Sequence, residues 1–514
     1  MDRLTRRQAL RGGAGAVAAA TLFDRAHASA QESPVDLVRF AWGTDVGSPN
    51  PFQVSSAGPG GAALLSLIYD TLTWKDAEGI IPWLATAWEA SPDGLTYTLT
   101  LDAAATWQDG RPLTAADVAF SLHYYARFPY KWMSTEVVAG AVDAGDGRVA
   151  ITLTRPYAAF LEEIAGIVPI LPRHVWEPIS DPIAATGAEL AVGSGPYRLD
   201  AYDATAAAYR LLAHDGYWRG TPRVREWQQL TVPAQTSLQT VQAGEVDIAL
   251  STDASVRELL ADDPRLTVHE TAPLSIVRLA VNTAVSPLDR REVRQAIAYA
   301  LDRARIAETI TRGPAIVGSA GVIPPETPWH NPALPQYAFD PDRARELLVG
   351  EALTIGLIAD TAAREPDLMV PMLAEVGITL DVQRVDGPTR IALLGEGDFQ
   401  LALTSHIGVG ADPDFLRRWF AGEETNGFAK GSIFTNAEFT ALGDEQAAAL
   451  DPAARRAIVL RMQEILAEEL PTIVLYHRRF SWVYDASVFT PMETWGGLMN
   501  GIPFPTNKLA LLGG

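Results

Sequence analysis

Apolar and polar residues alternate in several short segments in the first third of the chain. After the turn signal Asp-Gly at 93–94, Tyr97, Leu99 and Leu101 alternate with threonines. Val149, Ile151 and Leu153 alternate with other residues after the Asp-Gly at 146–147. Such alternation is typical of half-buried β-strands. Thr114 and Asp117 have the spacing of a capping box and precede apolar residues on one helical face. We therefore expect hairpins that lead into a helix beginning near residue 114.

Later in the chain, apolar residues repeat at helical spacing. Asp289 and Glu292 can cap a helix, and the apolar stripe after them comprises Val293, Ala296, Ile297, Ala300, Leu301 and Ile310. Asp-Pro pairs at 340–341 and 451–452 predict two further helix starts, because proline is favoured in the first turn. Apolar runs at 353–358, 401–403 and 472–475 predict strands between the helices. The alternation over roughly 273–480 indicates a mixed α/β fold.

The first 30 residues have the composition of an export signal. Four arginines lie within the first eleven residues, the apolar stretch 12–23 follows, and small residues surround positions 26–30. A secretory signal peptide has this order, and the apolar stretch is shorter than the about 20 residues of a spanning helix. The pair Arg6-Arg7 resembles the twin-arginine signal, which usually has a large apolar residue where Ala9 stands. We expect residues 1–30 to be cleaved and the mature chain to be periplasmic; a disordered basic tail is the alternative.

Composition restricts the partners and the chemistry. With 41 Lys and Arg against 62 Asp and Glu, the net charge is −21, which argues against nucleic acid and anionic lipid as partners. The 514 residues exceed one hydrophobic core, so two or three domains are expected. The chain has no cysteine, which excludes disulfides, thiolate chemistry and a lipid anchor on an N-terminal cysteine. We expect a soluble protein.

The common catalytic motifs are missing from the sequence. It contains no G-x-S-x-G, no H-E-x-x-H and no phosphate-binding glycine loop, and none of its eight histidines pair at metal-ligand spacing on a helix. We therefore expect no enzymatic activity, no cofactor and no metal. An extracytoplasmic enzyme that carries a cofactor is the alternative, because twin-arginine export often carries such cargo.

Six stretches together resemble the extracytoplasmic solute-binding proteins of ABC importers, in the family that takes up peptides, nickel complexes and opines (family 5). Each stretch is weak alone, but all six occur in the family's order and span nearly the whole mature chain. They are residues 68–121, 193–199 (GSGPYRL), 216–220 (GYWRG), 242–250 (QAGEVDIAL), 291–303 (REVRQAIAYALDR) and 340–348 (DPDRARELL).

The resemblance implies a two-lobed periplasmic-binding-protein fold, class II and of the type C cluster, with an extra small domain and a two-strand hinge. Lobe I would comprise residues 31–66, 190–272 and 484–514, the accessory domain residues 67–189, and lobe II residues 273–483. The chain would cross between the lobes near 270–277 and 480–486. In this family the ligand is enclosed between the lobes, so that closure reports occupancy.

The resemblance also suggests where a ligand would bind, although packing roles are the alternative for each residue. The end of the first mature strand would reach the cleft, and the segment 404–420 (TSHIGVGADPDFLRRWF) matches the part of the family that lines it. The candidate ligand-binding residues are Trp42, Thr44, Asp45, Asn282, Trp329, His406, Asp412, Trp419 and Trp495.

One position departs from the family pattern. Peptide-binding members have an aspartate three positions before Asp-Pro-Asp, where it holds the α-amino group of the ligand. In this sequence Val409 occupies that position. Because a buried ammonium without a carboxylate is costly, we expect peptide capture through the α-amino group to be absent.

The function implied by the resemblance is that of a periplasmic substrate-binding protein of an ABC transporter. A monomer would capture an oligopeptide or another small organic solute and deliver it to the permease subunits in the inner membrane. A solute sensor that is not coupled to transport is an alternative, because it would need no different pocket.

Overall fold

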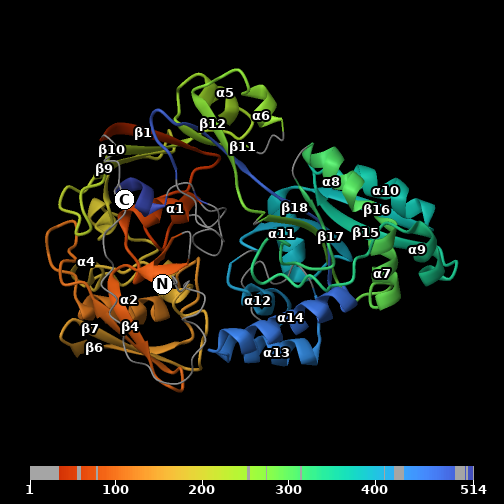
Figure 1. The fold of residues 1–514 in the computed structure, drawn as a ribbon, viewed down its shortest axis with the longest axis horizontal. Coiled ribbons are helices and arrows are strands. Elements are labelled where there is room, and N and C mark those ends of the chain that lie inside the picture. Colours follow the sequence, from red (N-terminus) through yellow and green to blue (C-terminus); the bar gives the residue numbers. More distant parts are fainter. Residues whose placement is uncertain are drawn as a thin grey trace, which may run out of the picture.

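The protein has two lobes, each built around its own β-sheet (Figure 1). The computed structural model describes residues 34–54, 60–76, 79–251, 255–273, 275–312, 315–409, 411–421, 433–491, 504 and 507–512. The predicted signal peptide and Trp495 lie outside these residues.

The sheet of the first lobe has seven strands in the order β12-β19-β11-β1-β10-β9-β8. Its central strand β1 pairs in parallel with β10 and β11, and the remaining pairs are antiparallel. The strands are β1 (Val35–Trp42), β8 (Tyr197–Asp203), β9 (Ala208–Ala213), β10 (Val224–Thr231), β11 (Ile248–Ser251), β12 (Leu266–Glu270) and β19 (Ser481–Asp485). The helices of this lobe are α1 (Gly60–Ile68), α5 (Ser237–Gln242), α6 (Val256–Leu259) and α15 (Lys508–Leu512).

The accessory region lies between α1 and β8 in the sequence and has a four-stranded antiparallel sheet in the order β4-β5-β7-β6. As predicted, Asp117 accepts a hydrogen bond from the backbone N–H of Thr114 at 2.9 Å, where the helix α2 begins. The elements of the region are β2 (Thr73–Lys75), β3 (Ile80–Pro82), β4 (Ala85–Ala90), β5 (Thr96–Leu101), α2 (Ala115–Arg127), β6 (Val138–Gly145), β7 (Arg148–Leu153), α3 (Ile164–Ile167), α4 (Arg173–Trp176) and a 3₁₀ helix (Ala188–Ala191).

The sheet of the second lobe has six strands in the order β14-β18-β13-β17-β15-β16, with helices on both faces. Its strands are β13 (Ser275–Val281), β14 (Ile316–Val317), β15 (Leu353–Asp360), β16 (Ile378–Val385), β17 (Leu401–Ile407) and β18 (Thr472–Arg478). Its helices are α7 (Arg291–Ala300), α8 (Arg303–Thr311), α9 (Pro341–Leu348), α10 (Glu365–Glu375), α11 (Gly387–Glu396), α12 (Phe415–Phe420), α13 (Ala437–Ala448) and α14 (Pro452–Glu469).

Two of the three predicted helix starts in this lobe are confirmed. Asp340 and Asp451 accept backbone hydrogen bonds at the beginning of α9 and α14, at 2.9 and 2.8 Å. The third prediction was wrong, because α7 begins at Arg291 and its N-cap is Arg290 rather than Asp289. Ile310 belongs to α8 rather than to the stripe of α7, since the chain leaves helical geometry at Leu301.

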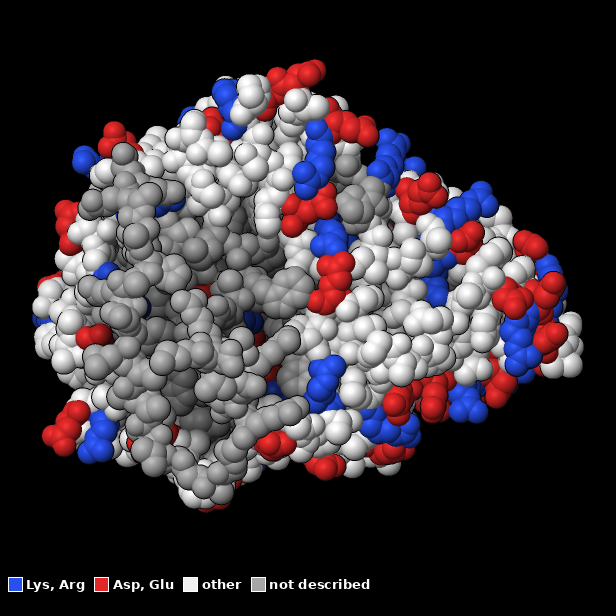
Figure 2. Space-filling model, viewed as in Figure 1, with Lys and Arg blue, Asp and Glu red and all other residues white. Residues whose placement is uncertain are grey.

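Acidic and basic side chains are interspersed over the described surface of the second lobe in Figure 2. The face shown there carries its charge as local pairs rather than as one extended patch. None of the helices in the described ranges has both the length and the apolar composition of a membrane span.

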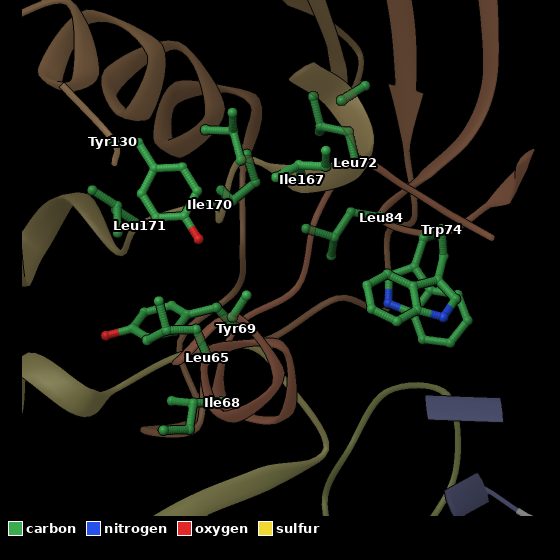
Figure 3. Close-up of a cluster of buried hydrophobic side chains, with 14 of the residues drawn as sticks. Leu65, Ile68, Tyr69, Leu72, Trp74, Leu84, Tyr130, Ile167, Ile170 and Leu171 are labelled. Atoms are coloured by element: carbon green, nitrogen blue, oxygen red, sulfur yellow. The ribbon is translucent and has the colours of Figure 1, made fainter. Parts of the chain in front are cut away.

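One hydrophobic core joins the first lobe to the accessory region. It runs from β1 and α1 through α2, β5 and β7 to residues near the C-terminus. Figure 3 shows Leu65 of α1 and Tyr69, which directly follows that helix, in the same cluster as Leu84, Ile170 and Leu171 of the accessory region. The sheet of the second lobe has separate core clusters. The accessory region therefore packs as part of the first lobe.

Candidate functional site

Two strand connections link the lobes and are hydrogen-bonded to each other. The chain crosses from β12 to β13 and returns from β18 to β19. Thr271 donates its backbone N–H to the carbonyl of Phe480 at 2.9 Å, and the N–H of Phe480 donates to the Thr271 hydroxyl at 3.0 Å. These paired crossings form a two-strand hinge.

Strand register determines which residues of the second lobe lie beside the hinge. Ser275, at the start of β13, is opposite Ile407 of β17 and Arg478 of β18. β15 is parallel to β17, so its carboxyl end at Asp360 lies at the same edge. Ligands of open α/β sheets usually bind beyond the carboxyl ends of the strands. We call this border the hinge edge.

His406 and Trp419, both predicted site residues, meet near the hinge edge. Their ring centroids are 4.8 Å apart. The Arg278 guanidinium lies 5.3 Å from the Trp419 ring, and its Nη2 is 3.3 Å from Nε2 of His406. Burial, with the charges of Arg278 and Arg390, lowers the pKa of His406 well below its usual value. The imidazole is therefore neutral near pH 7 and has one donor and one acceptor nitrogen.

A cavity of about 410 Å³ opens on the same edge. It lies between the loop that leads into α10, the start of β13, the ends of β15, β17 and β18, and the first turn of α11. Its polar lining includes Arg364, Arg390, Arg478, Thr404 and Ser405. Thr404, which lines the cavity, lies two positions before His406 in β17, so both side chains are on the same face of the strand. Arg390, another lining residue, is close enough to act on the charge of His406.

Asp412 has a structural role, which corrects the expectation of a solute contact. Both of its carboxylate oxygens accept hydrogen bonds from Arg455 at 2.6 Å, and Asp412 is buried. The Arg455 guanidinium also stacks over Trp329, 5.4 Å from the ring. Asp412 and half-buried Trp329 therefore hold α14 against the loop before α12.

Asn282 is also structural, because it lies just beyond the end of β13 that is remote from the hinge. Its side-chain amide donates to the carbonyls of Gly397 and Phe399 at 3.2 and 3.0 Å, and its oxygen accepts from the N–H of Ala284. The expectation that Asn282 faces a cleft does not fit this position.

The three candidates of the first lobe lie at and after the end of β1. Trp42 is 9% exposed, and its indole packs against Phe40 and against α1, where a Cβ at Gly60 would come within 2.3 Å of Nε1. Asp45 is exposed and accepts hydrogen bonds from the hydroxyls of Tyr209 and Tyr202 at 2.6 and 3.2 Å. These bonds lower its pKa although partial burial opposes them. Thr44 is exposed in the loop between them.

Val409, where peptide-binding relatives have an aspartate, is fully buried in an apolar cluster with Ile276, Phe415 and Leu416. A carboxylate at this position would have to be desolvated among apolar side chains. The local packing thus matches the apolar residue that the sequence has.

The accessory region contacts the second lobe through a buried charged cluster. Glu163 pairs with Arg418 of α12 at 2.8 Å, and the Tyr157 hydroxyl donates to Asp414 at 3.2 Å. Ala158 donates its backbone N–H to the carbonyl of Ala447 in α13 at 2.7 Å. Burial raises the pKa of Glu163 to about 7, against the lowering effect of Arg418. We call this group the mouth contact, because it bridges the lobes through residues other than those of the hinge.

Sequence reasoning missed the arginines of the hinge edge, although each left a signal. Arg278 stands in the otherwise apolar strand SIVRLAV. Arg390 lies in the first turn of α11, which has no acidic residue there, and a cation is disfavoured at that end of a helix. The described residues contain no cluster of three His, Cys, Asp or Glu that could hold a metal ion.

Several known proteins resemble this chain along most of its length. Heme-binding protein A of Haemophilus influenzae is 25% identical over 440 residues, 78% of this chain and 80% of that protein. The dipeptide-binding protein of Escherichia coli is 25% identical over 452 residues, 80% of this chain and 82% of that protein.

Solved structures share the fold. NikA from Brucella suis in complex with Fe(III)-EDTA superposes with a TM-score of 0.78 at 23% identity, over 91% of this chain and 99% of that one. The binding protein AgaA of A. tumefaciens R10 in complex with agropinic acid gives a TM-score of 0.76 at 23% identity, over 93% and 98%.

The family model for bacterial extracellular solute-binding proteins, family 5, matches residues 79–428, which is more than half of the chain. The description of this family as solute-binding proteins is in keeping with two lobes that are joined by a hinge. This chain belongs to the bacterial extracellular solute-binding proteins of family 5.

Proposed function

We propose that the protein captures a peptide-like or other small organic solute between its lobes and delivers it to the permease subunits of an ABC importer. The observation that carries the proposal is the hinge edge. The 410 Å³ cavity and the His406–Trp419 pair lie together beside the two crossing strands. The residues that line the cavity belong to the second lobe. A solute held there would favour the closed arrangement through the contacts that the first lobe adds on closure, because ligand-driven closure requires a higher affinity for the closed state.

The cellular setting extends this proposal. The N-terminal sequence supports export and cleavage near residue 30. The pair Arg6-Arg7 supports export by the twin-arginine route. The protein would then act in the periplasm as a soluble monomer without a lipid anchor. Lobe I would comprise residues 31–66, 190–272 and 484–514, with the accessory domain at 67–189 and lobe II at 273–483.

The relatives favour an organic solute but leave its class broad. Their names include dipeptide, heme and nickel binding, and the solved structures include complexes with the peptide STSA and with agropinic acid. The loss of the aspartate at Val409 supports a solute that is not held by an α-amino group.

Native mass spectrometry of residues 31–514 from a periplasmic extract tests the proposal. We expect added mass that is lost on unfolding, or, for an empty protein, a rise in melting temperature with at least one member of a panel of peptides, opines and metal chelates. At a hundred-fold excess over Kd, a solute adds about 2.7 kcal/mol of stability. A tightly held redox cofactor, or no shift with the whole panel, would contradict a receptor role.

Substitution of Trp419 tests the hinge-edge site. Trp419→Ala should weaken solute binding by about 1–3 kcal/mol, because a half-buried aromatic wall is lost. The measurement is isothermal titration with the solute identified above. Trp88→Ala is the matched control, since Trp88 is a partly buried indole in β4 of the accessory region. Equal affinities of the wild type and Trp419→Ala would refute the placement of the site.

Blocking the amino terminus of a peptide tests the consequence of Val409. We expect a bound peptide and its N-acetylated form to have affinities within about three-fold of each other. Val409 stands where the resemblance places the aspartate, and the cavity carboxylates Asp360 and Glu365 already accept hydrogen bonds within the protein. Fluorescence competition measures both affinities. A large loss of affinity on acetylation would mean that another carboxylate performs the same task.

A further inference from the structure

Three arginines line the hinge-edge cavity without an ionic partner. Among the residues that the structure describes, Arg364, Arg390 and Arg478 have no carboxylate within ion-pair distance. Two of them donate hydrogen bonds to neutral groups: Arg390 to the carbonyl of Leu403 at 3.1 Å, and Arg478 to the Tyr476 hydroxyl at 3.5 Å. We call these three residues the arginine triad.

Such a group is unusual in a protein where acidic residues outnumber basic ones by 62 to 41. Arg384, on the neighbouring strand β16, shows the ordinary behaviour: it pairs with Asp367 of α10 at 2.7 Å. Acidic and basic side chains are similarly interspersed over the face in Figure 2. The arginine triad therefore departs from the pairing of acidic and basic side chains around it, and it does so at the hinge-edge cavity.

The two carboxylates in the cavity lining are already engaged within the protein. Asp360 accepts the N–H of Ala362 at 3.0 Å. Buried Glu365 accepts the Tyr476 hydroxyl at 2.7 Å and the backbone N–H of Arg364 at 3.1 Å. With three guanidinium groups and two carboxylates, the lining has a formal charge of +1.

Two buried polar atoms in the same lining lack a hydrogen-bond partner within the described part of the chain. They are the hydroxyl of Thr404, a residue that is 3% exposed, and Nε of Arg390. A buried donor left unpaired costs stability. Both atoms can donate to an anionic oxygen, and the bond between Arg390 and Leu403 holds the guanidinium in place for it.

We propose that the arginine triad and Thr404 bind a carboxylate of the solute, so that the captured solute is an organic acid. This inference rests on the proposed function. The formal charge of +1 matches a carboxylate better than a dianionic phosphate. A local cationic site also offsets the repulsion that this acidic protein exerts on an anion.

The test uses pairs of probes that differ only in one charge: short peptides and opines, each as the free acid and as the amide of that acid. Titration and thermal shift compare the wild type, the double variant Arg390→Gln/Arg478→Gln and the control Arg384→Gln. We expect the acid to bind the wild type and Arg384→Gln at least ten-fold more tightly than the amide. In the double variant this preference should fall below three-fold, with amide binding preserved.

Each outcome has a definite meaning. Acid and amide of equal affinity for the wild type, or a double variant that retains the full preference, would overturn the inference while the receptor function stands. Binding of no probe by the wild type would contradict the proposed function, and the inference would fail with it. The melting temperature without solute shows whether the double variant is folded, and Thr404→Val, which removes only the hydroxyl, provides a second variant expected to reduce the preference.

Discussion

Replacing Lys508 by methionine should destabilise the protein by about 3–5 kcal/mol, because it leaves a buried carboxylate without its cation. Lys508 and Asp70 are both fully buried, and Nζ lies 2.6 Å from Oδ1. Lys508 also donates to the carbonyl of Tyr69 at 2.9 Å and lies 4.5 Å from the Trp74 ring. The pair fastens α15 to the core that joins the first lobe and the accessory region.

Asp70 accepts more than one donor, which makes the loss of the cation hard to relieve. Trp83 and Trp218 donate their indole N–H groups to its two oxygens at 2.7 and 3.1 Å. These neutral donors bind both carboxylate oxygens but do not supply the positive charge of Lys508. Burial lowers the pKa of Lys508 although Asp70 opposes this, so the ammonium depends on the same partner.

Urea denaturation of Lys508→Met, Asp70→Asn and the double variant measures the effect. The double variant should lose less than the sum of the single losses, because neither charge is then left alone. Lys75→Met is the matched control: its pair with Glu162 has the same 2.6 Å distance but is partly exposed, and exposed pairs contribute about 0–1 kcal/mol. Similar losses for Lys75→Met and Lys508→Met would show that burial of the pair is not decisive.

Local features of the fold could be predicted from the sequence, and contacts between distant segments could not. Asp340 and Asp451 cap helices as expected because a cap involves residues three positions apart. The cap predicted at Asp289 was wrong by one residue, since an N-cap pattern does not fix where tertiary packing starts a helix.

At the candidate site, too, contacts between distant segments could not be predicted from the sequence. His406 and Trp419 were identified through a segment that resembles a family, and they do meet. The same segment predicts Asp412 as a solute contact. Its ion pair with Arg455 could not be predicted, because the two residues are 43 positions apart and no local pattern links them. The likeness to the family and to its solved structures is enough to predict two lobes. The single core shared by the first lobe and the accessory region is seen only in the packing of the structure.

Because of that shared core, the mouth contact joins two bodies that move relative to each other about the hinge. Tyr157 and Glu163 move with the first lobe, because the accessory region and the first lobe are one packed body. Asp414 and Arg418 belong to the second lobe. Any motion about the hinge that separates the lobes must therefore break the pairs between them.

Arg418→Met should accordingly shift the protein toward an open arrangement. In the structure, where the mouth contact is formed, Arg418 pairs with Glu163 at 2.8 Å and lies 4.0 Å from Asp414, and all three side chains are at most 17% exposed. Removal of one member of a buried charge pair across an interface costs about 2–5 kcal/mol. When the lobes of Arg418→Met open, the carboxylates that Arg418 paired with regain water. The free-energy cost of the substitution therefore falls on the closed arrangement. Because the solute needs that arrangement, solute affinity should fall by about 30-fold or more.

Small-angle scattering with and without solute measures the arrangement directly, and titration measures the affinity. Without solute, the radius of gyration of Arg418→Met should be larger than that of the wild type. At saturating solute, the two radii of gyration should become similar. Arg461→Met is the matched control, because its pairs with Glu438 and Glu464 are exposed and lie within the second lobe. If Arg418→Met and Arg461→Met both scatter and bind as the wild type does, the mouth contact does not govern closure, and the hinge edge with its solute must supply the whole difference between the two arrangements.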